Sequence, residues 1–140
     1  MSYIGQGPTH RFLPTRRNHI THIVKIAGSH TLYLSVHDDG QPEEIFLRVN
    51  GSDGSSELIG LYDVAARLMS LALQHGVRLE RIGDLLAGAK LAPYGPVSEH
   101  DRIKHCSSLP DLIGRHLLVE YCGRHELAHL PLSTNAEEAS

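Results

Sequence analysis

The hydrophobic pattern changes its period once along the chain, and this change constrains the fold more than any other feature. Between residues 19 and 49, apolar and polar residues alternate, most clearly at residues 20–26 and 31–36. Over residues 57–75 the apolar residues recur instead at intervals of three and four. Alternation is typical of strands with one buried face, and the longer interval is typical of an amphipathic helix. The sequence therefore predicts a sheet followed by a long helix.

Turn residues separate three expected strands, at residues 20–26, 31–36 and 44–49. A Gly-Ser pair at residues 28–29 ends the first strand. The run Asp-Asp-Gly-Gln-Pro at residues 38–42 is a strong turn, because Asp and Gly accept the positive φ that tight connections need. We expect an antiparallel meander of about three or more strands with one face to bury.

A long helix is expected over Glu57–His75, and its broad apolar face predicts that it lies against the sheet as the central element. Gly76 follows at the position where a Schellman-type cap ends a helix, with Val77 placed to close the cap. A short second helix is expected over Leu79–Ala87. Residues 89–105 should be irregular, because their Pro-Tyr-Gly-Pro run cannot continue a helix.

The last helix is expected to start near Pro110. Ser108 and Asp111 have the S-x-x-D spacing of a weak capping box, and proline is tolerated in a first turn. Gly123 should end or bend this helix. Together these elements predict an α+β fold, in which an antiparallel sheet packs on one long helix and two shorter helices.

The length of 140 residues corresponds to one domain. We expect residues 1–10 to be a flexible arm, residues 11–130 to form a single domain and residues 131–140 to be a disordered polar tail. No apolar run approaches the ~18 residues of a membrane span, and the N-terminus lacks the features of a signal peptide. We therefore expect a cytoplasmic protein without a membrane partner. The net charge of −3 gives no global argument for nucleic-acid binding.

Metal coordination and cysteine catalysis have little support in the sequence. There is no C-x-x-C pair, and eleven histidines make accidental spacings common. We expect no metal site and no catalytic residue. The alternative is a zinc site at Cys122, His125 and His129, with Cys106 or His105 as a fourth ligand.

Two further expectations follow from the predicted sheet. His19 and His22 lie three apart on one strand, so they should point to opposite faces and cannot easily bind one ion together. A sheet of three strands also leaves open edges, and open edges invite pairing, which favours a homodimer.

Two features are weak candidates for binding a nucleotide or another anion. Gly54, Ser55 and Ser56 lead into the N-terminus of the long helix, where free amide groups and the helix dipole favour anions. Arg16 and Arg17 belong to the one cluster of basic residues in the sequence. The alternatives are simple helix capping for the first feature and a solvated surface for the second.

Five segments carry a family resemblance, in order and with compatible spacing: residues 13–17, 39–47, 54–58, 70–77 and 107–111. The strongest is residues 39–46, which follow the pattern D-G-x-P-x-E-[IV]-F. These segments resemble the TSCPD domain, found at the C-terminal end of adenosylcobalamin-dependent ribonucleotide reductases and also as short stand-alone proteins. The naming motif departs from the family, because Ser107 replaces Thr and Leu109 replaces Cys. The motif positions, to which we assign architectural roles, are Asp39, Gly40, Pro42, Glu44, Phe46, Gly76, Ser108, Pro110 and Asp111.

The resemblance implies a stand-alone TSCPD-domain protein associated with ribonucleotide reduction and thus with deoxyribonucleotide supply for DNA synthesis. The full-length reductases use adenosylcobalamin and paired redox thiols in a large barrel, and this chain is too short and too poor in cysteine to build one. We therefore expect an accessory module that binds no cofactor, with a ribonucleotide reductase chain in trans and a nucleotide as its expected partners. The alternative is a regulatory or protein-interaction module that retains the fold without a link to the reductase.

Overall fold

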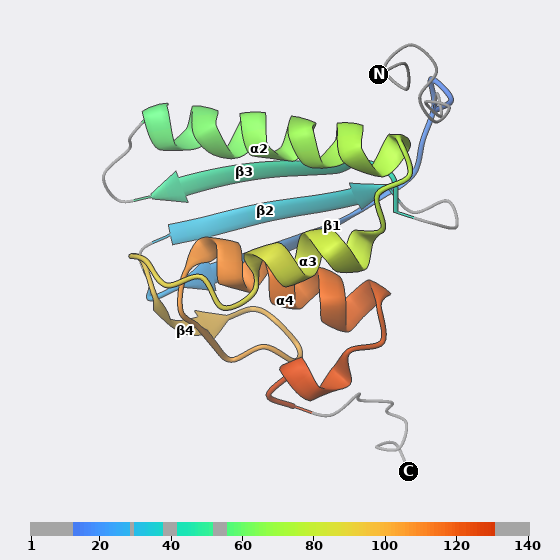
Figure 1. The fold of residues 1–140 in the computed structure, drawn as a ribbon. Helices are drawn as coiled ribbons and strands as arrows, with labels where there is room; N and C mark the ends of the chain where they lie inside the picture. Colours follow the sequence, from blue (N-terminus) through green and yellow to red (C-terminus); the bar gives the residue numbers. More distant parts are fainter. Residues whose placement is uncertain (1–12, 29, 38–41, 52–55, 131–140) are drawn as a thin grey trace.

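The computed structural model describes residues 13–28, 30–37, 42–51 and 56–130. Five strands form one antiparallel sheet in the order β3-β2-β1-β4-β5 (Figure 1). The three strands expected from the alternating pattern are present and pair as a meander. The strands are β1 (His19–Ile26), β2 (His30–His37), β3 (Ile45–Gly51), β4 (Gly95–Ser98) and β5 (His105–Cys106).

The three expected helices are also present, so the α+β prediction is confirmed. They are α2 (Ser56–Gln74), α3 (Leu79–Leu86) and α4 (Leu109–Tyr121), followed by the short 3-10 helix η1 (His125–Leu127). None of the helices in the described ranges is both long enough and apolar enough to cross a bilayer. The predictions for residues 1–10 and 131–140 lie outside the described residues.

The expected cap of α2 is formed. Gly76 has a φ of +98°, and its amide donates to the carbonyl oxygen of Leu73 at 3.0 Å. The amide of Val77 donates to the carbonyl oxygen of Ala72, also at 3.0 Å. These two bonds are the Schellman pattern, in which a residue with positive φ lets the chain turn back over the last helical carbonyls. Glycine at position 76 adopts this φ without steric cost.

The prediction that residues 89–105 are irregular is wrong for residues 95–98 and 105, which are strand. β4 pairs with the outer edge of β1, where Ile26 lies opposite Val97, and β5 pairs with β4. The carbonyl oxygen of Pro96 accepts a hydrogen bond from the Ala27 amide at 2.7 Å. Proline excludes a helix here, but its fixed φ is compatible with a short extended segment whose carbonyls still accept.

The prediction that the long helix is the central element is also wrong. α2 lies along the edge strand β3 (Figure 1). Ser70 fastens it there, because its buried hydroxyl accepts from the Ile45 amide at 2.8 Å and donates to the Ile45 carbonyl oxygen at 3.1 Å. α4 takes the central place instead, and its Leu112 and Leu117 are fully buried.

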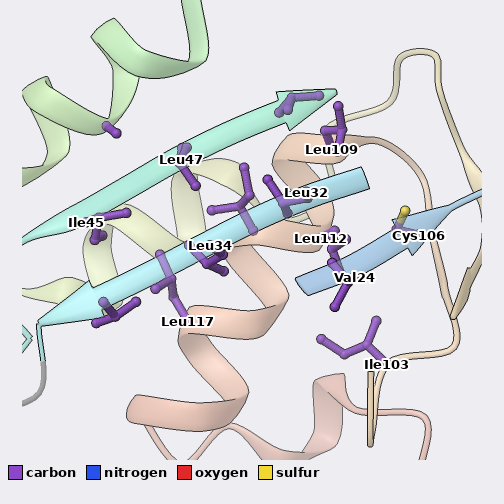
Figure 2. Close-up of a cluster of buried hydrophobic side chains, with 14 of the residues drawn as sticks. Val24, Leu32, Leu34, Ile45, Leu47, Ile103, Cys106, Leu109, Leu112 and Leu117 are labelled. Atoms are coloured by element: carbon purple, nitrogen blue, oxygen red, sulfur yellow. The ribbon is translucent and has the colours of Figure 1, made fainter. Parts of the chain in front are cut away.

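The core lies between the sheet and the helices. Figure 2 shows Leu32 and Leu34 of β2 together with Leu112 and Leu117 of α4 in one buried cluster. In each long strand the residues that enter this core alternate, as the pattern predicted. The buried strand residues are Val24, Ile26, Leu32, Leu34, Val36, Ile45, Leu47 and Val49.

Two glycines bring α3 and α4 into close contact. A Cβ atom on Gly114 would lie 2.6 Å from the amide nitrogen of Ala87 and 2.8 Å from the carbonyl oxygen of Gly83. A Cβ atom on Gly83 would lie 2.6 Å from Cγ of Leu118. The two backbones therefore approach closely only because both positions lack a side chain.

Candidate functional site

The segment Ser107–Asp111, which carries the naming motif, builds the start of α4. Ser108 is the N-cap residue, and its hydroxyl accepts from the Asp111 amide at 2.9 Å and donates to the Ala89 carbonyl oxygen at 2.7 Å. The hydroxyl of Ser107 donates to the same carbonyl oxygen at 2.8 Å. The motif therefore ties α4 to the chain that follows α3. Pro110 lies in the first turn, where its missing N–H costs no hydrogen bond.

The Asp111 carboxylate does not complete the capping box on Ser108. It accepts instead from the amides of Gly88 at 2.7 Å and Ser107 at 2.9 Å, and from Nε of Arg115 at 3.1 and 3.2 Å. Burial by itself would raise the pKa of Asp111, but the two amides and Arg115 together hold the pKa below its ordinary value. The group is therefore an ionised structural anchor at neutral pH.

An open pocket lies beside this motif and carries both apolar and basic groups. Its lining includes Tyr94, Lys90, His105, Cys106 and Arg115. The ring of His105 lies 3.7 Å, centroid to centroid, from the ring of His129. Leu109, at the position where the family motif has cysteine, is buried in the core and takes no part in the pocket surface.

Neither cysteine is a reactive thiol. Cys106 is buried and Cys122 is half-buried, and burial raises the pKa of both thiols. The thiolate is the nucleophilic form, so both groups stay protonated and unreactive at neutral pH. The two thiols therefore do not fit the redox-thiol chemistry that the resemblance associates with full-length reductases.

A buried histidine cluster lies between β1, the connection from β4 to β5, and α4. The ring of His116 lies 4.4 Å from that of His22 and 5.3 Å from that of His100, between centroids. Ligand atoms of His100, His116 and Glu120 lie within 4.8 Å of one another. The sequence interpretation did not single out these last three residues. The available signal was the H-x-x-x-E spacing of His116 and Glu120, which places both on one face of a helix.

The hydrogen bonds of the cluster fix which ring atoms carry protons. Nδ1 of His100 accepts from the amides of Arg102 at 3.0 Å and Ile103 at 3.1 Å, so the proton of the neutral ring is on Nε2. That N–H donates to Nδ1 of His116 at 3.1 Å, which places the His116 proton on Nε2. A metal ion on Nε2 of His100 would have to displace this proton while Nδ1 remains an acceptor. The geometry therefore favours a hydrogen-bonded chain over a metal centre.

Burial keeps the two inner histidines neutral. Desolvation, reinforced by the nearby His22, lowers the pKa of His100 to about 4. The same causes, with His100 in addition, lower the pKa of His116 well below its ordinary value. Nε2 of His116 and Nδ1 of His22 are buried and make no hydrogen bond within the described part of the chain. Protonation of His100 would therefore place a positive charge in a buried site, where the cost of desolvation outweighs the attraction of the nearby Asp101.

The cluster of basic residues near the N-terminus is only partly available to bind a ligand. Arg17 makes two hydrogen bonds to Glu44, at 2.7 and 3.1 Å, and Nε2 of His19 lies 3.1 Å from the same carboxylate. Burial would raise the pKa of Glu44, but Arg17 and His19 lower it overall. Arg16 is exposed. His19 and His22 point to opposite faces of the sheet, as their spacing predicted.

Several other candidate positions lie outside the described residues or only border them. Asp39, Gly40, Gly54 and Ser55 fall in undescribed segments. Ser56 is the first residue of α2. The anion-binding prediction for this helix start therefore stays a prediction. The remaining motif positions, Pro42 and Phe46, are half-buried and 49% exposed, respectively.

The alternative metal ligands have other contacts. Cys122 is the C-cap residue of α4, and His125 begins η1 with its Nδ1 3.1 Å from Nη1 of Arg102. Nδ1 of His129 accepts from the Lys104 amide at 3.0 Å. Within the described ranges, Cys122, His125 and His129 do not form a set of converging ligand atoms. Their role as metal ligands stays a prediction.

The chain is similar to known proteins over most of its length. The chain matches the family model of the TSCPD domain over residues 6–121. It is 35% identical over 126 residues to a vitamin B12-dependent ribonucleotide reductase of Bradyrhizobium diazoefficiens, a match that covers 88% of this chain and 10% of that protein. The corresponding enzyme of Agrobacterium fabrum is 36% identical over 123 residues, or 86% of this chain and 9% of that protein.

A third reductase of the same description, from Rhodopirellula baltica, is 34% identical over 116 residues, which cover 81% of this chain and 11% of that protein. The chain therefore spans about a tenth of the length of these relatives. No solved structure matches. The family match covers most of the chain, and the strand, turn and cap positions quoted for the resemblance fall inside it. This chain belongs to the TSCPD domain family.

Proposed function

We propose that this chain is a stand-alone TSCPD module that serves ribonucleotide reduction by binding a vitamin B12-dependent reductase chain in trans. The observation that carries the proposal is the extent of the match. The family model covers residues 6–121, while the similar segment is about a tenth of each named reductase. A domain that makes up one part of a large enzyme supplies a surface for that enzyme more readily than the enzyme's whole chemistry.

The role is accessory because the groups for autonomous catalysis do not fit. Burial raises the pKa of Cys106 and Cys122, so neither thiol is poised to donate electrons or attack a substrate. In this proposal adenosylcobalamin stays with the partner reductase and supplies the radical chemistry there. The contribution of this chain is binding.

The face of the sheet opposite the helices is the proposed contact surface. Ile23 lies opposite Tyr33, and Tyr33 opposite Arg48, so the three form one row across β1, β2 and β3. Ile23 is 49% exposed, and Lys25 and Arg48 are exposed on the same face by strand alternation. An apolar centre with a basic rim suits a protein surface that has an apolar patch and acidic neighbours.

A binding measurement tests the proposal. The full chain is immobilised, and the vitamin B12-dependent reductase of the same organism, with any TSCPD segment of its own removed, is passed over it. We expect saturable binding that Ile23→Glu weakens at least tenfold. The matched control is Leu85→Glu, because Leu85 is 82% exposed on α3, away from this face. Absence of binding by the folded wild-type chain would overturn the in-trans role.

Nucleotide binding is a second candidate, favoured by the aromatic and basic groups of the same face. Phe46 lies opposite Ser35, one row from Tyr33, so two aromatic rings accompany Lys25 and Arg48. Rings stack on bases and cations pair with phosphates. We expect calorimetric titration with a nucleoside diphosphate to give binding that Arg48→Ala weakens and the exposed control Arg81→Ala does not. If the chain binds neither the reductase nor the nucleotide, the remaining interpretation is an interaction module without a link to the reductase.

A further inference from the structure

The outer face of α2 carries a line of apolar side chains. Leu61, Val64, Leu68 and Leu71 are 60%, 50%, 62% and 50% exposed. The inner face of the same helix packs on the core through other residues, among them Ala66, Met69 and Leu73. The apolar stripe expected from the sequence is therefore two stripes, of which the sheet buries only one. Half-exposed aliphatic residues in an unbroken line are unusual on a surface helix and mark a contact surface.

The spacing of this line is that of a coiled-coil seam. With one polar residue added at each end, its members are Glu57, Leu61, Val64, Leu68, Leu71 and His75, and we call this set the α2 seam. Successive members are 4, 3, 4, 3 and 4 residues apart, so the average spacing is slightly more than 3.5 residues. At about 100° per residue the six positions fall within about 80° of arc. An apolar repeat of this period packs against another helix by knobs into holes.

The α2 seam is symmetric about its centre, and this identifies its partner. We propose that the α2 seam is the interface of a homodimer, in which two copies pack α2 antiparallel about a twofold axis that crosses the exposed face of the helix midway between Val64 and Leu68. Leu61 of one copy then lies opposite Leu71 of the other, and Val64 opposite Leu68. A twofold interface uses the same patch on both subunits, and a sequence-symmetric seam meets this condition.

The charges at the ends of the α2 seam select the antiparallel arrangement. Glu57 and His75 stand at equal distances from the centre, and both are exposed. In the antiparallel pair each Glu57 faces a His75, so an acceptor meets a donor at both ends. In a parallel pair Glu57 would face Glu57, which like-charge repulsion disfavours. An unrelated helix would not have to match this symmetry.

The apolar part of the α2 seam is short, so the expected dimer is weak. Leu61 to Leu71 spans about 15 Å of helix at 1.5 Å per residue. Stable specific interfaces bury about 1,200 Å² or more in total, and a contact of this length reaches that area only with its flanking residues. We expect reversible association in the micromolar range. The α2 seam shares no residue with the proposed contact surface of Ile23, Tyr33 and Arg48, so the inference does not depend on the proposed function.

Sedimentation velocity over a range of about 1 to 300 μM tests the association. We expect a concentration-dependent monomer–dimer equilibrium in which Leu68→Glu raises the dissociation constant at least tenfold. The control Leu85→Glu changes a leucine on α3 that is still more exposed, at 82%, and should leave the constant unchanged. Circular dichroism checks that each variant is folded. A wild-type chain that stays monomeric throughout, or a dimer that Leu68→Glu does not weaken, would overturn the proposal.

Disulfide trapping tests the antiparallel register in a Cys122→Ser background. Val64→Cys and Leu68→Cys chains are oxidised separately and as an equimolar mixture. The antiparallel pair brings position 64 of one copy opposite position 68 of the other, so the mixture should give mainly the mixed dimer. Equal or better cross-linking of each variant with itself would indicate parallel packing and overturn the register.

Discussion

An oxygen of the Asp111 carboxylate lies 2.7 Å from the amide nitrogen of Gly88, which joins the first turn of α4 to the end of α3. The same side chain is 1% exposed. It also accepts hydrogen bonds from the Ser107 amide and the Arg115 guanidinium. The family motif is therefore the point at which the chain after α3 meets the first turns of α4. The consequences of this arrangement, and of three others, can be measured.

Replacing Asp111 by alanine should lower the free energy of unfolding by about 3 kcal/mol. The change leaves two part-buried amides without their acceptor and removes the counter-ion of Arg115. Urea unfolding at pH 7.5 measures the effect. The control is Asp63→Ala, which breaks an exposed ion pair with Arg67 and should cost less than about 0.5 kcal/mol. Equal losses in the two variants would contradict an anchoring role.

Acid should destabilise the protein through the histidine cluster. A neutral His100 with a folded-state pKa of about 4 and an unfolded value near 6.5 binds fewer protons when folded. Its contribution to stability is therefore complete above about pH 6.5 and is lost as the pH falls toward 4. By linkage, this histidine alone should account for about 2 kcal/mol lost at pH 5, and His116 should add to it.

Denaturant unfolding between pH 5 and pH 7.5 measures this dependence. A His116→Leu variant should show a shallower decline of stability below pH 6.5, because one fewer group gains a proton on unfolding. The exposed His75→Leu variant is the control and should keep the wild-type slope. If His116→Leu leaves the slope unchanged, the buried cluster is not the origin of acid sensitivity.

The close contact of α3 and α4 should not tolerate a methyl group. Gly114→Ala places Cβ 2.6 Å from a backbone nitrogen, which cannot move as a flexible side chain would. We expect a loss of about 2 to 4 kcal/mol in the free energy of unfolding. Gly60→Ala is the matched helical control, since nothing lies within 4 Å of its Cβ position, and it should stabilise by about 0.5 to 1 kcal/mol. Thermal melts of the two variants should therefore shift in opposite directions.

Ser70→Ala should loosen α2 from β3. The change removes the buried hydroxyl that bonds both the N–H and the C=O of Ile45, which costs about 2 kcal/mol. Ser35→Ala, which removes an exposed hydroxyl pair with Thr21, should change stability by less than about 0.5 kcal/mol. Hydrogen exchange of the Ile45 amide gives a local measurement. Unchanged protection of this amide in Ser70→Ala would argue against the fastening role.

The residues of the sequence determine those features that depend on neighbours along the chain. Alternation placed the three long strands, and the 3.6-residue period placed all three helices, because both report which residues share a face. The cap residues Gly76 and Ser108 were identified for the same reason, since a cap is formed by groups a few residues apart. The family segments also followed from sequence order.

Features that depend on distant segments were decided only by the tertiary structure. β4 and β5 are too short to show a period. β4 forms because the free edge of β1 offers it a partner, and β5 pairs in turn with β4. His22, His100 and His116 come from three elements, so no spacing could unite them. The apolar pattern of α2 did not distinguish its buried leucines from its exposed leucines. Periodicity states that a face is apolar, and only the packing of the whole chain decides whether that face is covered.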